Sequence, residues 1–215
     1  NLGLQYEPYG QNGIWYELKL KVARKLILSK WKEALGGNLE IIVSGSAPLQ
    51  QRLAKVFTAA DMILVEGYGL TETSPIISVG DMRNNNLKMG TVGKVIDGVE
   101  VKIADDGEIL CKGPNVMMGY YKEEAMTAEC FTEDGYFMTG DRGERREPSG
   151  LLKITGRVKE IFKTSKGKYV APAPIENMIN NEPEIDQCMV YGDKKNYLVA
   201  LIVPNKDFLN EKEKI

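Results

Sequence analysis

The pattern that most constrains the fold of this chain is a strand-helix-strand succession in its first third. Two short apolar runs, residues 39–43 and 62–65, flank a stretch over residues 48–60 that can form a helix, with Pro48 in its first turn. Such a succession is typical of a β-α-β unit with parallel strands, and proline fits the start of its helix. We therefore predict an α/β segment, and we expect ligands to bind where loops leave the carboxyl ends of its strands.

A long helix over residues 13–35 is expected to precede this unit, because Gly36 and Gly37 are typical of a helix end. Its apolar stripe runs through Ile14, Leu18, Val22 and Leu26, with Trp15 and Trp31 beside it. The opposite face is basic and carries Lys19, Lys21, Arg24, Lys25, Lys30 and Lys32 against Glu17 and Glu33. Two interpretations of that face stay open: a solvated helix surface, which is the simpler one, and a surface for a membrane or an acidic partner.

From about residue 90 the chain changes to short strands and turns. Residues 99–103 and 108–112 flank the turn Asp105-Asp106-Gly107 and predict a β hairpin. A helix over residues 122–130 and strands near residues 136–139 and 151–155 are expected next. These elements favour a small antiparallel β subdomain.

The last part of the chain predicts a helix near residues 174–181 and strands at residues 185–191 and 197–203. We therefore expect residues 1–156 to form the C-terminal part of a large domain, and residues 157–215 to form a hinge and the start of a small α+β domain. The large-domain part divides into the α/β segment, about residues 1–89, and the β subdomain, about residues 90–156.

The composition excludes several kinds of site. Histidine is absent, which removes Ser-His-Asp and Cys-His catalysis and histidine metal sites. The three cysteines, Cys111, Cys130 and Cys188, form no CxxC pair and are typical of reduced thiols in a cytoplasmic protein. With 28 basic and 30 acidic residues, the net charge of −2 gives no field that favours nucleic acid. No apolar run approaches the roughly 20 residues that span a bilayer.

Two loops lie at the expected ligand edge. In the first, residues 44–48, the small residues Gly45, Ser46 and Ala47 allow a flat ring to approach the backbone, although an ordinary turn is the simpler interpretation. The second, residues 66–73, reads Glu-Gly-Tyr-Gly-Leu-Thr-Glu-Thr.

The second loop is the more informative, because it joins several functional groups in eight residues. Tyr68 offers an aromatic face next to Gly67. Thr71 offers a hydroxyl for phosphate, and Glu72 offers a carboxylate for Mg²⁺, which takes hard oxygen ligands.

Two further polar residues fit a nucleotide. Asp141 follows a strand at residues 137–140 and can accept hydrogen bonds from both hydroxyls of a ribose, while Arg157 suits ribose or phosphate. The simpler alternatives are a turn aspartate and a surface ion pair of Arg157 with a nearby carboxylate.

These segments together resemble the adenylate-forming superfamily, which includes acyl-CoA synthetases, firefly luciferase and the adenylation domains of peptide synthetases. The motifs occur in the family's order: Ser-Gly-Ser-Ala-Pro-Leu at residues 44–49, Glu-Gly-Tyr-Gly-Leu-Thr-Glu at 66–72, Gly-Glu-Ile to Gly-Tyr-Tyr at 107–121, Thr-Gly-Asp at 139–141, and Gly-Arg-Val-Lys-Glu at 156–160. The resemblance implies an adenylate-forming fold, truncated at both ends.

The resemblance also implies a role for each motif. Tyr68 would stack on adenine in a pocket that Gly45, Ser46, Ala47 and Gly67 line. Thr71 would contact the α-phosphate, Glu72 would hold Mg²⁺, and Asp141 and Arg157 would bind the ribose. Lys159 matches the hinge about which the small domain swings. The segment 164–169, with Lys166, Gly167 and Lys168, resembles the lining of the tunnel for CoA.

The reaction that the resemblance implies is ATP-dependent activation of a fatty acid to acyl-AMP, followed by transfer to CoA. Residues 33–37 and 168–177 are similar to the long-chain fatty acid–CoA ligase branch. The alternatives are a peptide-synthetase adenylation domain and a non-catalytic nucleotide- or acyl-binding fragment. The partners expected are fatty acid, ATP and CoA, in the cytoplasm or at the inner face of a membrane.

Two parts of the family pattern do not occur in this sequence. These are the phosphate loop, expected upstream, and the catalytic lysine, expected beyond residue 215; Lys212 and Lys214 lack the glycine that precedes it. A further departure is Met138, where many relatives carry a basic or polar residue. We therefore expect the isolated chain to catalyse no ATP–pyrophosphate exchange.

Overall fold

The computed structural model describes residues 2–47, 49–83 and 86–206. It forms two compact units. The first comprises Asn1–Val101, Cys111–Phe137 and Arg145–Lys153, and the second comprises Lys102–Leu110, Met138–Glu144 and Ile154–Ile215. The domain boundaries expected after residues 89 and 156 stay predictions.

The expected N-terminal helix is present as one helical run that contains a π-helical turn. Two short 3₁₀ turns, Gly3–Gln5 (η1) and Pro8–Gly10 (η2), precede it. The run consists of α1 (Ile14–Ala23), the π turn η3 (Arg24–Leu28) and α2 (Ser29–Ala34). It ends before Gly36 and Gly37, as expected.

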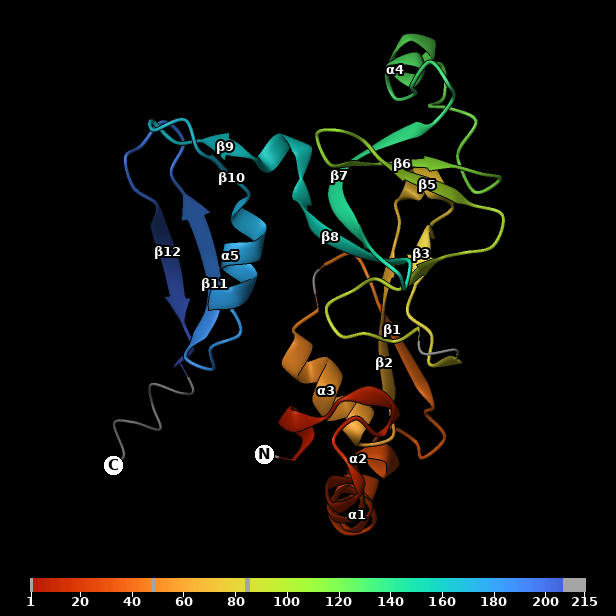
Figure 1. Ribbon diagram of the computed structural model, residues 1–215, viewed down its shortest axis with the longest axis vertical. Helices are drawn as coiled ribbons and strands as arrows, with labels where there is room; N and C mark the ends of the chain where they lie inside the picture. Colours follow the sequence, from red (N-terminus) through yellow and green to blue (C-terminus); the bar gives the residue numbers. More distant parts are fainter. Residues whose placement is uncertain (1, 48, 84–85, 207–215) are drawn as a thin grey trace. The chain divides into compact units, whose positions relative to one another are not determined.

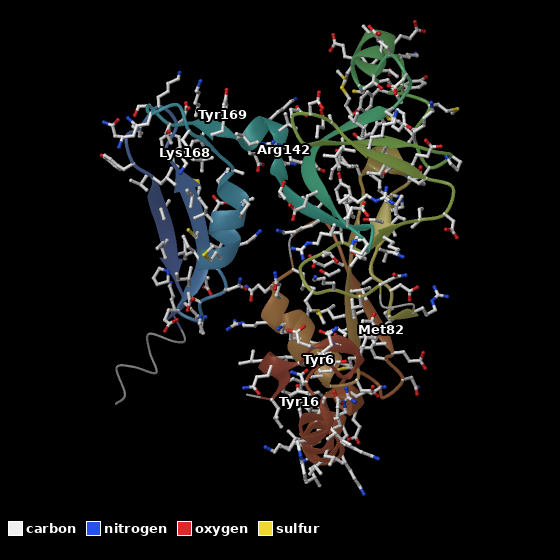
Figure 2. All side chains as sticks on the ribbon, viewed as in Figure 1. Tyr6, Tyr16, Met82, Arg142, Lys168 and Tyr169 are labelled. Carbon is white, nitrogen blue, oxygen red and sulfur yellow. The ribbon has the colours of Figure 1, made fainter. Side chains whose placement is uncertain are left out.

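This helix docks through a different face from the apolar stripe seen in the sequence. Leu20 is 1% exposed and joins Tyr6 and Ala59 in a small core, against which Tyr16 packs (Figure 2). The guanidinium Nε of Arg24 donates a hydrogen bond of 2.7 Å to the carbonyl oxygen of Ala59. The stripe itself is exposed: Ile14, Leu18, Val22 and Leu26 are each more than half accessible, from 51% to 74%.

The β-α-β unit is confirmed, with shifted boundaries. Strands β1 (Ile41–Ser44) and β2 (Ile63–Tyr68) run parallel, and α3 (Gln51–Ala59) connects them and packs on β2 (Figure 1). Helix α3 begins three residues later than expected, and Pro48 lies outside the described residues. Met62 and Val65 are buried.

The prediction of a loop over residues 66–73 is wrong for residues 66–68, which belong to strand β2. The reason is that β2 gains a second neighbour there: Gly67 and Tyr68 pair with Val79 and Ser78 of the antiparallel strand β3. After β2 comes a 3₁₀ turn, η4 (Thr71–Thr73). Strand β3 (Ser78–Val79) then pairs with β4 (Lys94–Val95), which completes a sheet in the order β1-β2-β3-β4.

A second four-stranded sheet, in the order β5-β6-β7-β8, confirms the antiparallel hairpin pattern. Its strands are β5 (Glu100–Ile103), β6 (Glu108–Lys112), β7 (Phe137–Arg146) and β8 (Leu151–Arg157), with the short helix α4 (Glu124–Glu129) before β7. The expectation that Asp141 ends a strand is wrong, because β7 continues to Arg146. Gly140, with φ of +72°, changes the backbone direction inside that strand without ending it.

The C-terminal segment forms a helix on a β hairpin, as expected. After the 3₁₀ turn η6 (Val158–Glu160) come the small strands β9 (Phe162–Lys163) and β10 (Tyr169–Val170) and helix α5 (Pro172–Ile179). Helix α5 packs against β11 (Ile185–Tyr191), which pairs with β12 (Val199–Pro204) in an antiparallel ladder (Figure 1). Within the described residues, no helix is long and apolar enough to cross a membrane.

Candidate functional site

The first group of candidate residues lies at the carboxyl ends of β1 and β2, in the first unit. Their parallel register places Ser44 opposite Glu66. A methyl group on Gly45 would stand 3.4 Å from the carbonyl oxygen of Gly67, so the loop after β1 lies close to the end of β2. Gly45, Ser46 and Ala47 are exposed, while Gly67 and Tyr68 are half-buried. The structure thus joins the two segments that the sequence suggested for adenine.

Glu66 contributes to this edge and was not singled out from the sequence. Its carboxylate accepts a hydrogen bond of 3.1 Å from the backbone N–H of Leu49, which ties the loop after β1 to β2. Burial raises the pKa of the Glu66 carboxyl, and the hydrogen bond from Leu49 opposes that rise. The only feature of the sequence that pointed to Glu66 was its place next to glycine at the end of an apolar run.

The turn after β2 requires glycine at position 69, because there is no room for a side chain. A Cβ atom there would lie 1.8 Å from the carbonyl oxygen of Pro75 and 2.9 Å from the Cα atom of Ile76. The chain therefore folds back on itself directly after Tyr68. Buried Thr73 locks the turn, because its hydroxyl donates to the carbonyl oxygen of Leu70 and accepts from the Leu70 N–H.

Glu72 is held by the segment that follows β6. Its Oε1 atom accepts a hydrogen bond of 2.9 Å from the hydroxyl of Tyr120, and its backbone oxygen accepts one of 2.7 Å from the N–H of Met117. The hydrogen bond to Glu72, with burial as a smaller cause, raises the pKa of Tyr120 to about 12. Thr71, beside Glu72, is exposed. Tyr120 was visible in the sequence only as part of the Gly-Tyr-Tyr motif.

The donor set around Glu72 fits a magnesium ion that arrives with a nucleotide. Magnesium is usually bound by one or two carboxylates, with phosphate oxygens and water as the remaining ligands. Glu72 supplies a carboxylate and Thr71 a hydroxyl. The described part of the chain has no group of three or more aspartate, glutamate or cysteine residues that could hold a metal without a substrate.

The second group of candidate residues lies in the second unit, on β7 and β8. Asp141 is buried, and its Oδ1 atom accepts a hydrogen bond of 3.0 Å from Nε of Arg157, whose side chain is 60% exposed. The neighbouring backbone is fixed as well: Thr139 donates from its hydroxyl to the carbonyl oxygen of Ile109, and the Gly140 N–H donates to Glu108. The ion pair considered for Arg157 is therefore present, and its partner is the other candidate ribose ligand.

A small hollow of about 220 Å³ adjoins this ion pair. Thr139, Gly140, Arg157, Lys159 and Glu160 line it. Lys159 is exposed and lies in the 3₁₀ turn η6, directly after β8. The predicted hinge residue thus lies beside the predicted ribose ligands.

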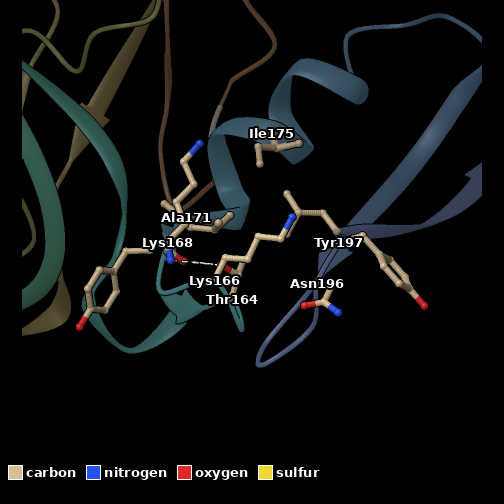
Figure 3. A pocket seen from close by; sticks show the side chains of 10 residues that line it. Thr164, Lys166, Lys168, Ala171, Ile175, Asn196 and Tyr197 are labelled. Atoms are coloured by element: carbon tan, nitrogen blue, oxygen red, sulfur yellow. Dashed lines mark hydrogen bonds between the residues drawn. The ribbon is translucent and has the colours of Figure 1, made fainter.

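The third group surrounds a larger cavity of about 470 Å³ beside the β9–β10 hairpin (Figure 3). Lys166 and Lys168 are among its lining residues, and Figure 2 shows Lys168 and Tyr169 on the same hairpin. The remaining lining residues are mostly apolar or aromatic: Thr164, Tyr169, Val170, Ala171, Ile175, Asn196, Tyr197 and Leu198. Gly167, with φ of +81°, forms the hairpin turn, and its N–H donates to the carbonyl oxygen of Thr164.

Family models match both parts of this chain. The model described as AMP-binding enzyme matches residues 12–121, which carry the first group, and the model described as AMP-binding enzyme C-terminal domain matches residues 159–215, which carry the third. The chain belongs to the family of AMP-binding enzymes. The roles given to individual residues above stay predictions.

Similar proteins of this family are fatty-acid ligases by name. The long-chain-fatty-acid–CoA ligase FadD15 of Mycobacterium bovis is 46% identical over 193 residues, which are 90% of this chain and 32% of that protein. Fatty acyl-CoA synthetase A of Dictyostelium discoideum is 40% identical over 84% of this chain and 29% of its own length. The chain thus spans about a third of the length of these relatives.

Solved structures of AMP-binding enzymes share the fold. The ATP-bound RpMatB-BxBclM chimera B1 is similar with a TM-score of 0.72 and 28% identity, over 86% of this chain and 39% of that one. O-succinylbenzoate coenzyme A synthetase from Bacillus subtilis, in complex with AMP, is similar with a TM-score of 0.70 and 26% identity, over 86% of this chain and 42% of that one. Both results confirm the adenylate-forming fold.

The close approach at Gly69 gives a testable prediction. We expect Gly69→Ala to destabilise the chain by about 3 kcal/mol or more, since the methyl group cannot be accommodated against the backbone of Pro75. The matched control is Gly67→Ala, two residues away, where an added Cβ would meet only ordinary contacts at 3.5 Å and beyond. Chemical denaturation compares the two variants, and equal denaturation midpoints would contradict the prediction.

Proposed function

We propose that the full-length protein is an AMP-forming long-chain fatty acid–CoA ligase. The observation that carries this proposal is the carboxyl edge of β1 and β2, where the Gly45 loop approaches Gly67 and the Thr71–Glu72 turn follows β2. This arrangement offers backbone, aromatic, hydroxyl and carboxylate groups to one nucleotide. The fatty-acid–CoA ligases among the similar proteins support the substrate class over a peptide-synthetase adenylation domain.

In the first step, the fatty-acid carboxylate attacks the α-phosphorus of MgATP, which releases pyrophosphate and leaves acyl-AMP. A carboxylate is already ionised at neutral pH, so this step needs no general base and fits a chain without histidine. The residues of this chain contribute positioning and charge stabilisation. Tyr68 stacks on adenine, Thr71 contacts the α-phosphate, and Glu72 holds the magnesium ion that accompanies ATP.

The ion pair of Asp141 with Arg157 prepares the ribose contact in this proposal. Arg157 uses Nε to hold one oxygen of the Asp141 carboxylate. The carboxylate is thereby oriented while it keeps acceptor capacity for ribose hydroxyls. Both the ion pair and the ribose contact can then exist together.

In the second step, the thiol of CoA attacks the acyl carbonyl and AMP leaves. The cavity beside the β9–β10 hairpin supports this assignment, because it combines two lysines with an apolar wall. Lysine ammonium groups attract the phosphates of CoA, and the apolar wall suits its pantetheine arm.

The adenylation step is tested by palmitate-dependent ATP–pyrophosphate exchange. We expect exchange in the full-length protein and none in the isolated 215-residue chain. Asp141→Ala in the full-length protein should raise KM for ATP about 10-fold or more, because a buried charge-assisted contact to ribose is lost. The control Asp105→Ala lies in the exposed β5–β6 turn and should leave KM unchanged. Full-length protein without palmitate-dependent exchange would refute the proposed activity.

The thioester step is tested by Lys168→Ala in the full-length protein. We expect KM for CoA to rise by about 5-fold or more, since one phosphate contact is removed, while pyrophosphate exchange stays unchanged. Lys122→Ala, an exposed lysine of the first unit, is the matched control. A parallel loss of exchange would instead assign Lys168 to adenylation.

Peripheral membrane contact at the inner face of a membrane is a further part of the proposal. On α1, the exposed side chains Ile14, Trp15, Leu18 and Val22 lie near exposed Lys19 and Lys21, and exposed Lys25 follows in η3. Exposed apolar groups with flanking lysines are typical of helices that bind anionic lipid surfaces.

Vesicle sedimentation tests this contact. We expect the full-length protein to sediment with anionic phosphatidylserine vesicles at low salt, and the bound fraction to fall at high salt, because salt screens the lysine charges. Replacement of Lys19, Lys21 and Lys25 by glutamine should reduce binding by about 10-fold. The reason is that each lysine contributes roughly 1 kcal/mol or less to the free energy of binding an anionic surface. Equal binding of this triple variant and the unmodified protein would refute the contact.

A further inference from the structure

We propose that Tyr120 is a positioning residue, which orients the carboxylate of Glu72 so that one of its oxygens faces the cation bound with ATP. This inference rests on the proposed function for the reaction itself. It assigns a role to Tyr120, for which the Gly-Tyr-Tyr motif implied none, on the segment between β6 and α4.

The geometry of the Glu72 side chain carries the proposal. Oε1 of Glu72 is engaged by the Tyr120 hydroxyl at 2.9 Å. A glutamate side chain in a turn has several accessible rotamers, and one directional hydrogen bond to one oxygen selects among them. The second oxygen, Oε2, is then presented to a cation in a fixed direction. Preorganisation of this kind reduces the entropy cost of binding the ion.

The position of Tyr120 is itself fixed by helix α4. The backbone N–H of Tyr120 donates a hydrogen bond of 2.9 Å to Oγ1 of Thr127, and the Thr127 hydroxyl donates one of 2.8 Å to the carbonyl oxygen of Glu123. A Cβ atom on Gly119 would lie 2.7 Å from Cγ2 of Thr127, so only glycine permits this approach. Helix α4 contributes no buried residue to the core. Its structural contribution is the hydrogen bond between Thr127 and the Tyr120 N–H, which holds the Tyr120 backbone.

Two further hydrogen bonds show that the Tyr120 hydroxyl is not needed to join its segment to the Glu72 turn. The segment before Tyr120 is already joined to the Glu72 turn, because the Met117 N–H donates to the backbone oxygen of Glu72 and the Asn115 amide donates to the carbonyl oxygen of Ile76 at 2.9 Å. These two bonds remain when the Tyr120 hydroxyl is removed. The hydroxyl therefore acts on the direction of the carboxylate, while the backbone bonds hold the two segments together.

Tyr120→Phe in the full-length protein removes only this hydroxyl. We use Mn²⁺ in place of Mg²⁺ and expect it to bind the protein–ATP complex about 10-fold more weakly. A loss of affinity of this size corresponds to the loss of one hydrogen bond to a charged group. Electron paramagnetic resonance of free Mn²⁺ measures that affinity without any need for turnover. The matched control is Tyr121→Phe, because Tyr121 is adjacent and 86% exposed. Equal Mn²⁺ affinity of the two variants would overturn the proposal.

A double-mutant cycle tests whether Tyr120 acts through Glu72. In the Glu72→Ala background we expect Tyr120→Phe to cause no further loss of Mn²⁺ affinity, because the oriented group is already gone. An equal loss in both backgrounds would overturn the positioning role. If Tyr120→Phe unfolds the protein, Thr127→Val is the second variant; it loosens the Tyr120 backbone and should weaken Mn²⁺ binding about 3-fold.

Measurements of Mn²⁺ binding and of pyrophosphate exchange together distinguish a failure of the Tyr120 proposal from a failure of the proposed function. Normal Mn²⁺–ATP binding without palmitate-dependent exchange would refute the ligase activity and leave the role of Tyr120 to be decided by the variants. Exchange that is normal in the unmodified protein and requires about 10-fold more Mg²⁺ in Tyr120→Phe would support both.

Discussion

Parallel pairing of β1 with β2 is the constraint on which the candidate site depends. It brings the loop after β1 and the end of β2 to one edge, with Ser44 opposite Glu66, and there the Gly45 backbone lies next to the Gly67 carbonyl oxygen. Strand β3 then pairs with the end of β2 and makes Gly67 and Tyr68 part of the sheet. A flexible loop would leave Tyr68 free to rotate about many bonds, whereas a paired strand fixes its backbone. The close approach of Gly69 to Pro75 turns the chain sharply after β2, and the turn that carries Thr71 and Glu72 follows.

Polar groups in the interior of both units are held by short, specific contacts. Glu66 is tied to Leu49, Glu72 to Tyr120, and Asp141 to Arg157. In each case a protein donor engages a carboxylate oxygen, which restricts the direction of that carboxylate.

Several features of the fold could be predicted from the sequence, and the limits of those predictions have physical causes. The β-α-β unit, the β5–β6 hairpin and the α5–β11–β12 unit follow from local patterns of apolar residues and turn residues. Strand ends differ from the prediction: β2 and β7 both extend beyond the expected boundary, because pairing with neighbouring strands overrides the local turn signals. Nothing local identifies Tyr120 as the partner of Glu72, since the two residues are 48 positions apart and meet only through folding.

The sequence alone determined the family, the kinds of element and the chemical groups available for a nucleotide. Those properties are local, because each motif carries its residue types in a fixed order. The tertiary structure decided which of these groups meet: Gly45 with Gly67, Glu72 with Tyr120, and Asp141 with Arg157. It also decided that the long N-terminal helix docks through Leu20 and leaves its apolar stripe exposed. Both outcomes depend on long-range packing and hydrogen bonding, which no pattern of neighbouring residues encodes.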